Sequence, residues 1–255
     1  MSILSFYVKT RGWPFIISWA HRLSGIILVV FTWFHIYTLS ALTVPGLYEA
    51  KMKIFRLLIF AFLEWALSIP VIFHALNGGR LILYESFGSR NDESMIRWTL
   101  GLSALYVALL GYLMLADSQS VSATFFWLTT LVAGFTLTYG VASRVWANQN
   151  SLAWKLQRIT AAYLLILVPA HMLFMHLNYP VAHDANTVLI RMQNYFIKAV
   201  DLSLMVGLLY HAGYGLISII RDYLPFQVLL LGLTGLVVLI MAIFVFIGIK
   251  LTLVI

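Results

Sequence analysis

The sequence contains seven long apolar stretches, which limit its possible folds more than any other feature does. They cover residues 14–42, 54–79, 97–116, 122–143, 156–177, 195–220 and 226–254. Each approaches or exceeds the roughly 20 residues that a helix needs to cross a bilayer core of about 30 Å. Backbone groups in hydrocarbon must form their hydrogen bonds within the segment, so helices are the expected structure. We therefore predict an all-α membrane protein with about seven transmembrane helices.

The composition supports a lipid environment and excludes several kinds of site. Only 10% of the residues are charged and 62% are hydrophobic, whereas about a quarter of a soluble domain is charged. The net charge of +7 does not predict nucleic acid binding, because the basic residues lie mainly in short connections between spans. The chain has no cysteine, which excludes disulfides, cysteine-ligated iron–sulfur clusters and covalent c-type heme. The histidines are therefore the candidate ligands of any redox centre.

The two halves of the chain are related by an internal repeat. Residues 21–35 match residues 157–171 at a shift of 136, including the arginine near the start and the histidine at the end of each segment. Residues 74–85 match residues 211–222 at a shift of 137, again with a histidine, a glycine four residues later and a final acidic residue. A repeat of this length indicates a duplicated structural unit.

The repeat predicts the organisation of the bundle. Residues 1–117 and 149–255 are expected to form two parallel three-helix units, and residues 118–148 a bridging transmembrane helix that returns the chain between them. Arginines and lysines are more frequent on the side where the chain begins, so we expect the N-terminus in the cytoplasm and the C-terminus outside. A bacterial or archaeal cytoplasmic membrane is the expected location.

Four histidines fall at two depths in this arrangement. At about 1.5 Å per residue, His35 and His171 each lie about 20 Å beyond the arginine that opens their helix, in the outer half of the membrane. His74 is predicted about 9 Å and His211 about 15 Å from the cytoplasmic end. Low-spin heme takes two axial ligands, and neutral imidazole is suitable. We predict an inner heme between His74 and His211 and an outer heme between His35 and His171.

Other interpretations of the histidines stay open. A single histidine in a membrane more often forms a helix-packing hydrogen bond or lines a substrate path, and a histidine-bound metal without porphyrin is a further alternative. His176 and His183 are expected to be interfacial residues. His21, Arg22 and Arg158, at the inner end, are candidates for neutralising heme propionates.

Around these residues the sequence resembles the cytochrome b membrane anchors of succinate dehydrogenases and fumarate reductases. The first half resembles the large anchor and the second half the small anchor, over most of 12–88 and 152–225. The motifs are Ser18-Trp-Ala-His21-Arg22-x-Ser24-Gly25, His74-x-x-x-Gly78-x-Arg80, Arg158-x-Thr160-Ala161, His211-Ala-x-x-Gly215 and Asp222-Tyr223. The resemblance implies that two anchors, separate in many relatives, are fused here.

The resemblance also implies cofactors and partners. His35 and His171 resemble the extra ligands of the two-heme members, so two b hemes are expected, together with a membrane quinone, menaquinone in many such members. It implies a flavoprotein subunit that holds FAD and an iron–sulfur subunit on the cytoplasmic face. This chain has neither a Gly-rich dinucleotide fingerprint nor a cysteine for that chemistry.

Two quinone sites are open at this point. The resemblance implies an inner site formed by Ser18, Arg22, Asp222 and Tyr223. An outer site would use Glu64 and Asp201, since an ionisable residue inside a membrane is a functional candidate. Either acid could relay protons, or it could accept a hydrogen bond from the imidazole of His35 or His171.

We therefore predict a diheme cytochrome b anchor of a succinate:quinone or quinol:fumarate oxidoreductase, whose dicarboxylate chemistry belongs to a partner subunit. One alternative is the cytochrome b of another quinone-linked dehydrogenase or of a hydrogenase. The other is a transporter built from a duplicated unit, although such transporters often have inverted repeats and broken helices, whereas this repeat is parallel.

Overall fold

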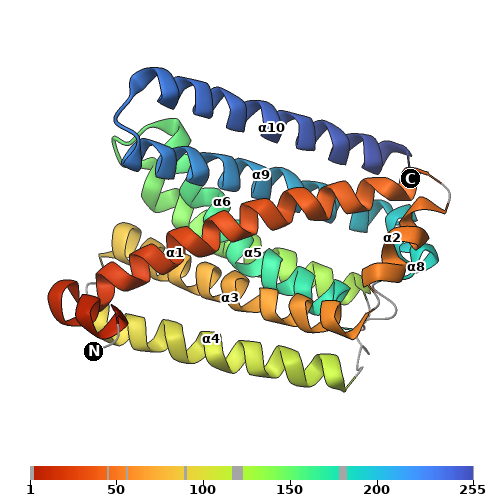
Figure 1. The fold of residues 1–255 in the computed structure, drawn as a ribbon, viewed down its shortest axis with the longest axis horizontal. Helices are drawn as coiled ribbons and strands as arrows, with labels where there is room; N and C mark the ends of the chain where they lie inside the picture. The colour runs from red at the N-terminus through yellow and green to blue at the C-terminus, as the bar shows by residue number, and fades with distance from the viewer. Residues whose placement is uncertain are drawn as a thin grey trace.

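The computed structural model describes residues 3–44, 46–55, 57–88, 91–116, 123–177 and 183–254, and this part of the chain is helical without any strand (Figure 1). Seven of the helices are long and apolar enough to cross a membrane, which confirms the predicted all-α membrane fold. They are α1 (Ile3–Ser40), α3 (Leu58–Phe87), α4 (Asp92–Leu115), α5 (Ala123–Trp146), α6 (Leu152–Met175), α9 (Tyr195–Tyr223) and α10 (Gln227–Val254).

Polar side chains cap the N-terminal ends of several of these helices. The side-chain oxygen of Asn91 accepts a hydrogen bond from the backbone N–H of Ser94 at the start of α4. Ser151 caps α6 in the same way, and Asn194 caps α9. The first N–H groups of a helix have no partner inside the helix, so a cap of this kind favours starting the helix there. The short polar connections between spans thus set the boundaries of the apolar helices.

The second span differs from the prediction. Residues 54–55 belong to the short helix α2 (Leu47–Phe55), and α3 continues to Phe87. The predicted span 54–79 ends just before Arg80, but Arg80 lies inside the helix and is only 8% exposed. Its guanidinium donates to Asn77 Oδ1 at 2.9 Å and to Asp92 Oδ1 at 2.7 Å. A charge that is paired in this way can be buried.

This longer helix corrects the predicted depth of the inner histidines. His74 precedes the end of α3 by 13 residues, and His211 precedes the end of α9 by 12. At about 1.5 Å per residue both lie about 18–20 Å from that end. The two inner histidines are therefore at equal depth, deeper than the spacing to Arg80 and Arg221 indicated.

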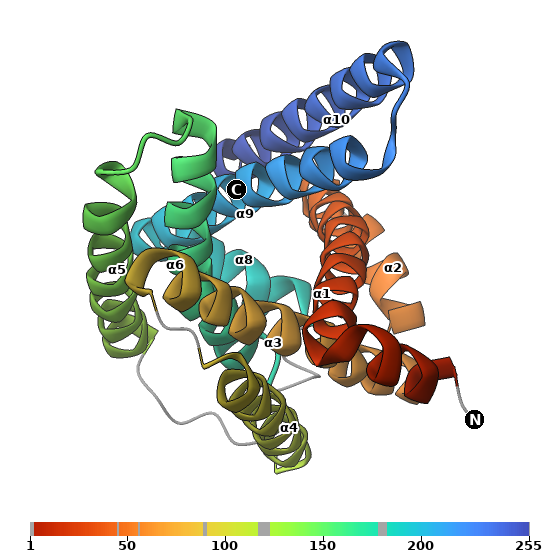
Figure 2. The ribbon, with the colours of Figure 1, turned by 90° about the vertical axis from the view of Figure 1, so that its left-hand side faces the viewer.

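Four helices form the centre of the bundle. Helix α1 contacts α3, α3 contacts α6, α6 contacts α9 and α9 contacts α1, so the four close a ring that Figure 2 views from one end. Helix α10 packs against α9 and α1, α4 against α3, and α5 against α6 and α3. The two chain ends lie at opposite ends of the bundle (Figure 1). We call the N-terminal end the inner end and the other the outer end, after the predicted topology.

The helix directions agree with two parallel units. In Figure 1, α1, α3 and α4 run in the same alternating directions as α6, α9 and α10, with α5 between them. The predicted division at 148–149 falls between α5 and α6, whereas the division at 117–118 lies outside the described residues. At the outer end, α2 and α8 (Ala185–Gln193) hold corresponding places in the two units. Ala185 of α8 packs with Tyr48 and Met52 of α2.

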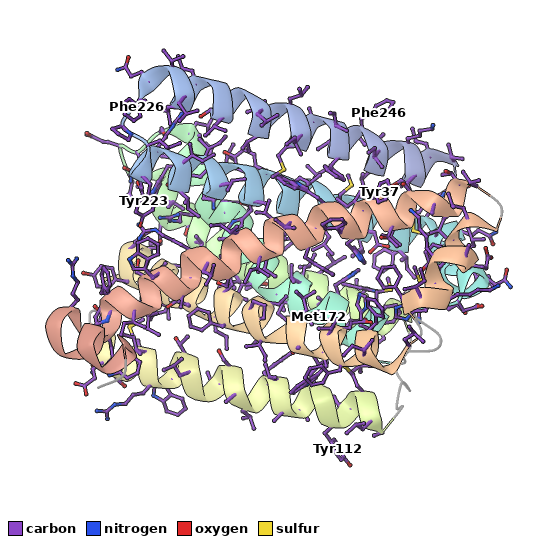
Figure 3. The ribbon with its side chains drawn as sticks, viewed as in Figure 1. Tyr37, Tyr112, Met172, Tyr223, Phe226 and Phe246 are labelled. Carbon is purple, nitrogen blue, oxygen red and sulfur yellow. The ribbon has the colours of Figure 1, made fainter. Side chains whose placement is uncertain are left out.

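The exterior of the bundle is apolar, as expected of a surface that faces lipid. Tyr112 on α4 and Phe246 on α10 point away from the bundle (Figure 3) and are each 67% exposed. Large apolar side chains are similarly exposed along the outer faces of α1, α3, α4, α5 and α10. A soluble monomer rarely exposes apolar surface so extensively, and the chain is a multi-pass membrane protein.

Close packing of α5 on α6 depends on Gly134, and this generates a prediction. A Cβ at Gly134 would lie 2.7 Å from Leu167 Cδ1, and Leu167 is fully buried. We expect Gly134→Ala to destabilise the protein by about 1–3 kcal/mol through overpacking, measured as a lower Tm in detergent. Gly140→Ala on the same helix is the control, because nothing lies within 4 Å of its Cβ. Equal melting temperatures of the two variants would contradict this account.

Candidate functional site

A cavity of about 1100 Å³ lies inside the ring of α1, α3, α6 and α9. It is lined by all four histidines that were predicted as ligands, and it extends from Ser18 and Arg22 at the inner end to residues of α8 at the outer end. Typical sites for one small ligand measure about 300–1000 Å³. The cavity is therefore large for a single ligand and connects the two predicted levels.

The inner histidines face each other across this cavity. The ring centres of His74 and His211 are 6.1 Å apart and the ring planes are perpendicular, at 90°. A metal–imidazole bond of about 2.0 Å adds to about 1.2 Å from the nitrogen to the ring centre, so two imidazoles on opposite sides of one ion have centres about 6.4 Å apart. The observed separation fits a pair of axial ligands.

Hydrogen bonds orient the ring of His74. Its Nδ1 lies 3.1 Å from the backbone carbonyl oxygen of His21 and 3.3 Å from Ser24 Oγ. An imidazole that donates from Nδ1 keeps the lone pair of Nε2 for a metal. In the other unit the carbonyl of Gln157, the repeat equivalent of His21, faces His211, although the geometry is too open for a hydrogen bond. The repeat thus extends to the groups that hold the rings.

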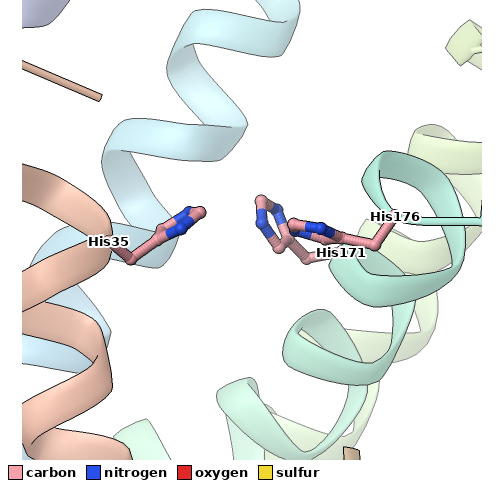
Figure 4. A group of neighbouring side chains, drawn as sticks. All are labelled: His35, His171 and His176. Atoms are coloured by element: carbon pink, nitrogen blue, oxygen red, sulfur yellow. The ribbon is translucent and has the colours of Figure 1, made fainter. Parts of the chain in front are cut away.

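The outer level contains one imidazole more than predicted. His35 on α1 faces His171 on α6, with ring centres 6.3 Å apart at 87°, again the separation of two axial ligands. His176 points into the same space (Figure 4), 6.0 Å from His35 and 5.4 Å from His171. One ring nitrogen of each lies within 4.8 Å of the others, so the three could also hold a metal ion.

Two glycines lie beside the inner pair, each next to a side chain of the cavity wall. A Cβ at Gly78 would lie 3.8 Å from His21 Cε1, and one at Gly215 would lie 3.9 Å from Gln157 Nε2. Both are ordinary contact distances, so a methyl group at either position would touch His21 or Gln157. The imidazole separation and the cavity between the rings fit a porphyrin at the inner level.

The groups predicted to meet heme propionates lie together at the inner end. Arg22 and Arg158 are already paired with carboxylates, whereas His21 Nδ1 is buried without a hydrogen-bond partner and its ring stacks on His74 at 4.0 Å. The sequence did not single out Asn77 and Gln157. Each has a buried, unpaired side-chain atom and lines the cavity, a feature that only burial reveals.

Two salt bridges join the repeats at the inner end. Arg22 donates to Asp222 at 3.1 Å and links α1 to α9. Arg158 donates to both oxygens of Glu85, at 2.5 and 2.9 Å, and links α6 to α3. The two arginines are repeat equivalents, and so are the two acids. Each bridge therefore joins the first helix of one unit to the second helix of the other.

The residues predicted as the inner quinone site also come together. Arg22 donates to Ser18 Oγ at 3.4 Å in addition to Asp222, and its guanidinium carbon lies 5.6 Å from the centre of the Tyr223 ring. Trp19 lies 5.2 Å from the same ring. Trp19, Arg22 and Tyr223 border a groove of about 670 Å³ between α1 and α9, whereas Ser18 and Asp222 line the central cavity, as Arg22 also does.

The outer acids do not bind the predicted partners. Glu64 accepts a hydrogen bond from His176 Nδ1 at 2.5 Å, and its other oxygen lies 3.5 Å from His183 Nε2. The alternative in which Glu64 accepts a hydrogen bond from His35 or His171 is therefore not observed among the described residues. His176 and His183, expected to be interfacial residues, bind this carboxylate with side chains that are 24% and 13% exposed.

Asp201 is buried near the outer end with one oxygen unpaired, and His171 Nδ1 is also buried without a partner. A hydrogen bond between them is therefore absent as well. Arg191 of α8 is the nearest compensating charge: burial lowers the pKa of its guanidinium, and the Asp201 carboxylate raises it. The sequence did not identify Arg191, because its approach to Asp201 depends on how α8 folds back.

Comparisons with known proteins agree with this geometry. The family model described as the succinate dehydrogenase/fumarate reductase transmembrane subunit matches residues 10–113 and 138–249. The succinate dehydrogenase 2 membrane subunit SdhC of Mycobacterium tuberculosis is 37% identical over 95 residues, which cover 36% of this chain and 69% of that protein. No solved structure matches the chain significantly.

The two salt bridges differ in strength, which gives a prediction. The Arg158–Glu85 pair is bidentate and its side chains are 24% and 30% exposed, whereas Arg22 and Asp222 are 33% and 47% exposed. We expect Glu85→Gln to cost about 1.5–3 kcal/mol of stability and Asp222→Asn about 0–1 kcal/mol. Thermal unfolding in detergent measures both, and a greater loss for Asp222→Asn would refute this ranking.

Proposed function

Because the chain belongs to the succinate dehydrogenase/fumarate reductase transmembrane subunit family, we propose that it is a diheme cytochrome b. It carries electrons between an iron–sulfur subunit and membrane quinone in a succinate:quinone or quinol:fumarate oxidoreductase. The observation that supports two hemes is the pair of cross-unit imidazole separations, 6.1 and 6.3 Å, within one cavity. Each separation suits two axial ligands of one iron.

His74 and His211 would hold the inner iron, and His35 and His171 the outer iron. Bound heme supplies one-electron redox chemistry, which none of these side chains provides alone. The chain positions the ligands: the carbonyl of His21 accepts the Nδ1 proton of His74 and so fixes both its tautomer and its ring orientation. The surrounding apolar helices exclude water from the ligands.

His21, Arg22 and Arg158 would face the propionates at the inner end. Each guanidinium has five N–H donors, so the bridges to Asp222 and Glu85 leave donors for a further anion. His21 offers an unpaired ring nitrogen. Together these groups would offset part of the cost of bringing acidic groups into the bundle.

The inner end of the bundle is the quinone site that the geometry favours. Tyr223 borders the groove, Ser18 lines the central cavity, and Arg22 lines both. The hydroxyls of Ser18 and Tyr223 can donate hydrogen bonds to quinone carbonyls, and Arg22 can stabilise the negative charge of a reduced quinone. Asp222 holds Arg22 in position. The second candidate is at the outer end, where Glu64, supported by His176 and His183, and Asp201 could exchange protons with menaquinone.

The proposed complex also contains an FAD-bearing flavoprotein and an iron–sulfur subunit, the latter docked at the inner end. We propose a bacterial or archaeal cytoplasmic membrane with the N-terminus in the cytoplasm, which places Arg11, Arg97, Arg144 and Arg221 on the cytoplasmic side. Family membership favours this function over a hydrogenase cytochrome or a transporter.

Heme quantitation tests the proposal. We expect two b hemes per chain in the purified complex by pyridine hemochrome, and one heme after either His35→Ala or His74→Ala, because each variant removes one axial ligand. His183→Ala is the control and should retain two hemes, since its contact is with Glu64. A complex with one heme that is unaffected by His35→Ala would argue against an outer heme. Metal analysis would then test a three-histidine metal site at that level.

The two quinone sites can be distinguished in the assembled complex. We expect Tyr223→Phe to lower kcat/KM for quinone reduction by succinate at least about tenfold, since one lost hydrogen bond of about 1.4 kcal/mol has that effect. Glu64→Gln should leave the inner site unchanged. Heme content, measured in parallel, should be normal in both variants. The reverse result, with only Glu64→Gln impaired, would assign the quinone to the outer end.

A further inference from the structure

The repeat generates two equivalent grooves at the inner end of the bundle, and they differ in what covers them. The open groove, between α1 and α9, is lined by eight residues: Ile16, Trp19, Ala20, Arg22, Leu23, Ile26, Ile219 and Tyr223. At shifts of 136 and 137, the equivalent positions on α6 and α3 are Leu152, Lys155, Leu156, Arg158, Ile159, Ala162, Ile82 and Ser86. Arg22 lines the open groove, and its equivalent Arg158 belongs to the second; each arginine forms one of the two cross-unit salt bridges.

Helix α5 fills the second groove. Val141 and Val145 of α5 are fully buried and pack against Ile82 and Ala162, which are 5% and 0% exposed. Ile159 packs against the same cluster. The groove between α3 and α6 is therefore closed along the stretch that corresponds to the open one.

The equivalent residues of the open groove remain uncovered. Leu23, the equivalent of Ile159, is 59% exposed, and Ile26, the equivalent of Ala162, is 37% exposed. Helix α10 packs along α9 as far as Ile220, near its inner end, whereas the α1 residues of the same cluster, Val29, Trp33 and Ile36, lie farther out. The inner part of α1 is left beside the groove of about 670 Å³.

The residues at the mouths of the two grooves also differ between the filled groove and the open groove. In the filled groove, the Lys155 ammonium donates to the carbonyl oxygen of Trp146, at the end of α5, at 2.9 Å. Its equivalent in the open groove is Trp19, which packs beside Tyr223. Ser86 takes the place of Tyr223 in the filled groove and offers no phenol ring. Arg158 stays bound to Glu85 beneath α5.

We propose that α5 occludes the second of two quinone grooves generated by the duplication, so that the chain binds one quinone at its inner end, between α1 and α9. The inference rests on the proposed quinone function. It gives the bridging helix a role besides returning the chain across the membrane.

Photolabelling of the assembled complex with an azidoquinone tests this, with labelled peptides identified by mass spectrometry. In the unaltered complex we expect label in residues 16–26 or 219–223 and none in 82–86 or 152–162. Leu23→Trp should fill the open groove and reduce labelling at least tenfold. It replaces an exposed side chain, so folding should be preserved. Ile159→Ala, at the equivalent buried position, is its matched control and should leave labelling of the open groove unchanged.

The triple variant Val141→Ala/Val145→Ala/Ile82→Ala removes apolar volume from the filled groove. We expect new label in 82–86 or 152–162. The lipid-facing variant Leu128→Ala/Val132→Ala on α5 should acquire none, because these side chains are 54% and 61% exposed. Failure of a folded triple variant, with normal heme content, to acquire label would overturn occlusion by α5. If the triple variant does not fold, the Leu23→Trp comparison still decides whether the open groove is the site.

Other outcomes separate this inference from the function itself. Label in both grooves of the unaltered complex would show that α5 excludes nothing. Label confined to α2, α8 or the outer ends of the spans would refute an inner site, while quinone reduction and heme content would still support the anchor function. A complex with neither heme nor quinone reduction would refute the proposed function.

Discussion

Burial of four imidazoles in an apolar bundle is the constraint on which the rest of the structure depends. A polar ring in hydrocarbon is costly without a partner. His74 finds one within its own unit, where the carbonyl oxygen of His21 lies beside its Nδ1, whereas Nδ1 of His171 and of His211 is buried without a hydrogen bond. His74 faces His211, and His35 faces His171, each from the other unit. The four helices that carry them close into a ring with a cavity at its centre.

The salt bridges at the inner end follow the same cross-unit rule. Arg22 binds Asp222 and Arg158 binds Glu85, so each of these two bridges joins the first helix of one unit to the second helix of the other. The duplication is nearly symmetric in these contacts, and α5 breaks the symmetry. By packing on α6 and α3 it buries one inner groove, whereas the other stays open beside Tyr223.

Much of this arrangement could be predicted from spacing. The shifts of 136 and 137 selected four histidines whose rings the structure brings together in two cross-unit pairs, and they related the two arginines and the two acids. Spacing did not predict the partners of a side chain where those partners come from other helices. Arg80 looked like the end of a span, but Asn77 and Asp92 pair it within the bundle. Glu64 looked like a partner of His35 or His171, but His176 and His183 reach it instead.

The sequence alone determined the number of spans, the parallel duplication and the residues that meet across it. Hydrophobic length and repeat spacing can be read directly from the chain. Hydrophobic length predicts spanning helices because a segment in the membrane has to form its backbone hydrogen bonds internally. Only the tertiary structure decided which polar groups are paired, where α2 and α8 fold back, and which groove α5 covers. Those outcomes depend on packing between helices distant in sequence, and no local pattern encodes the angle at which one helix approaches another.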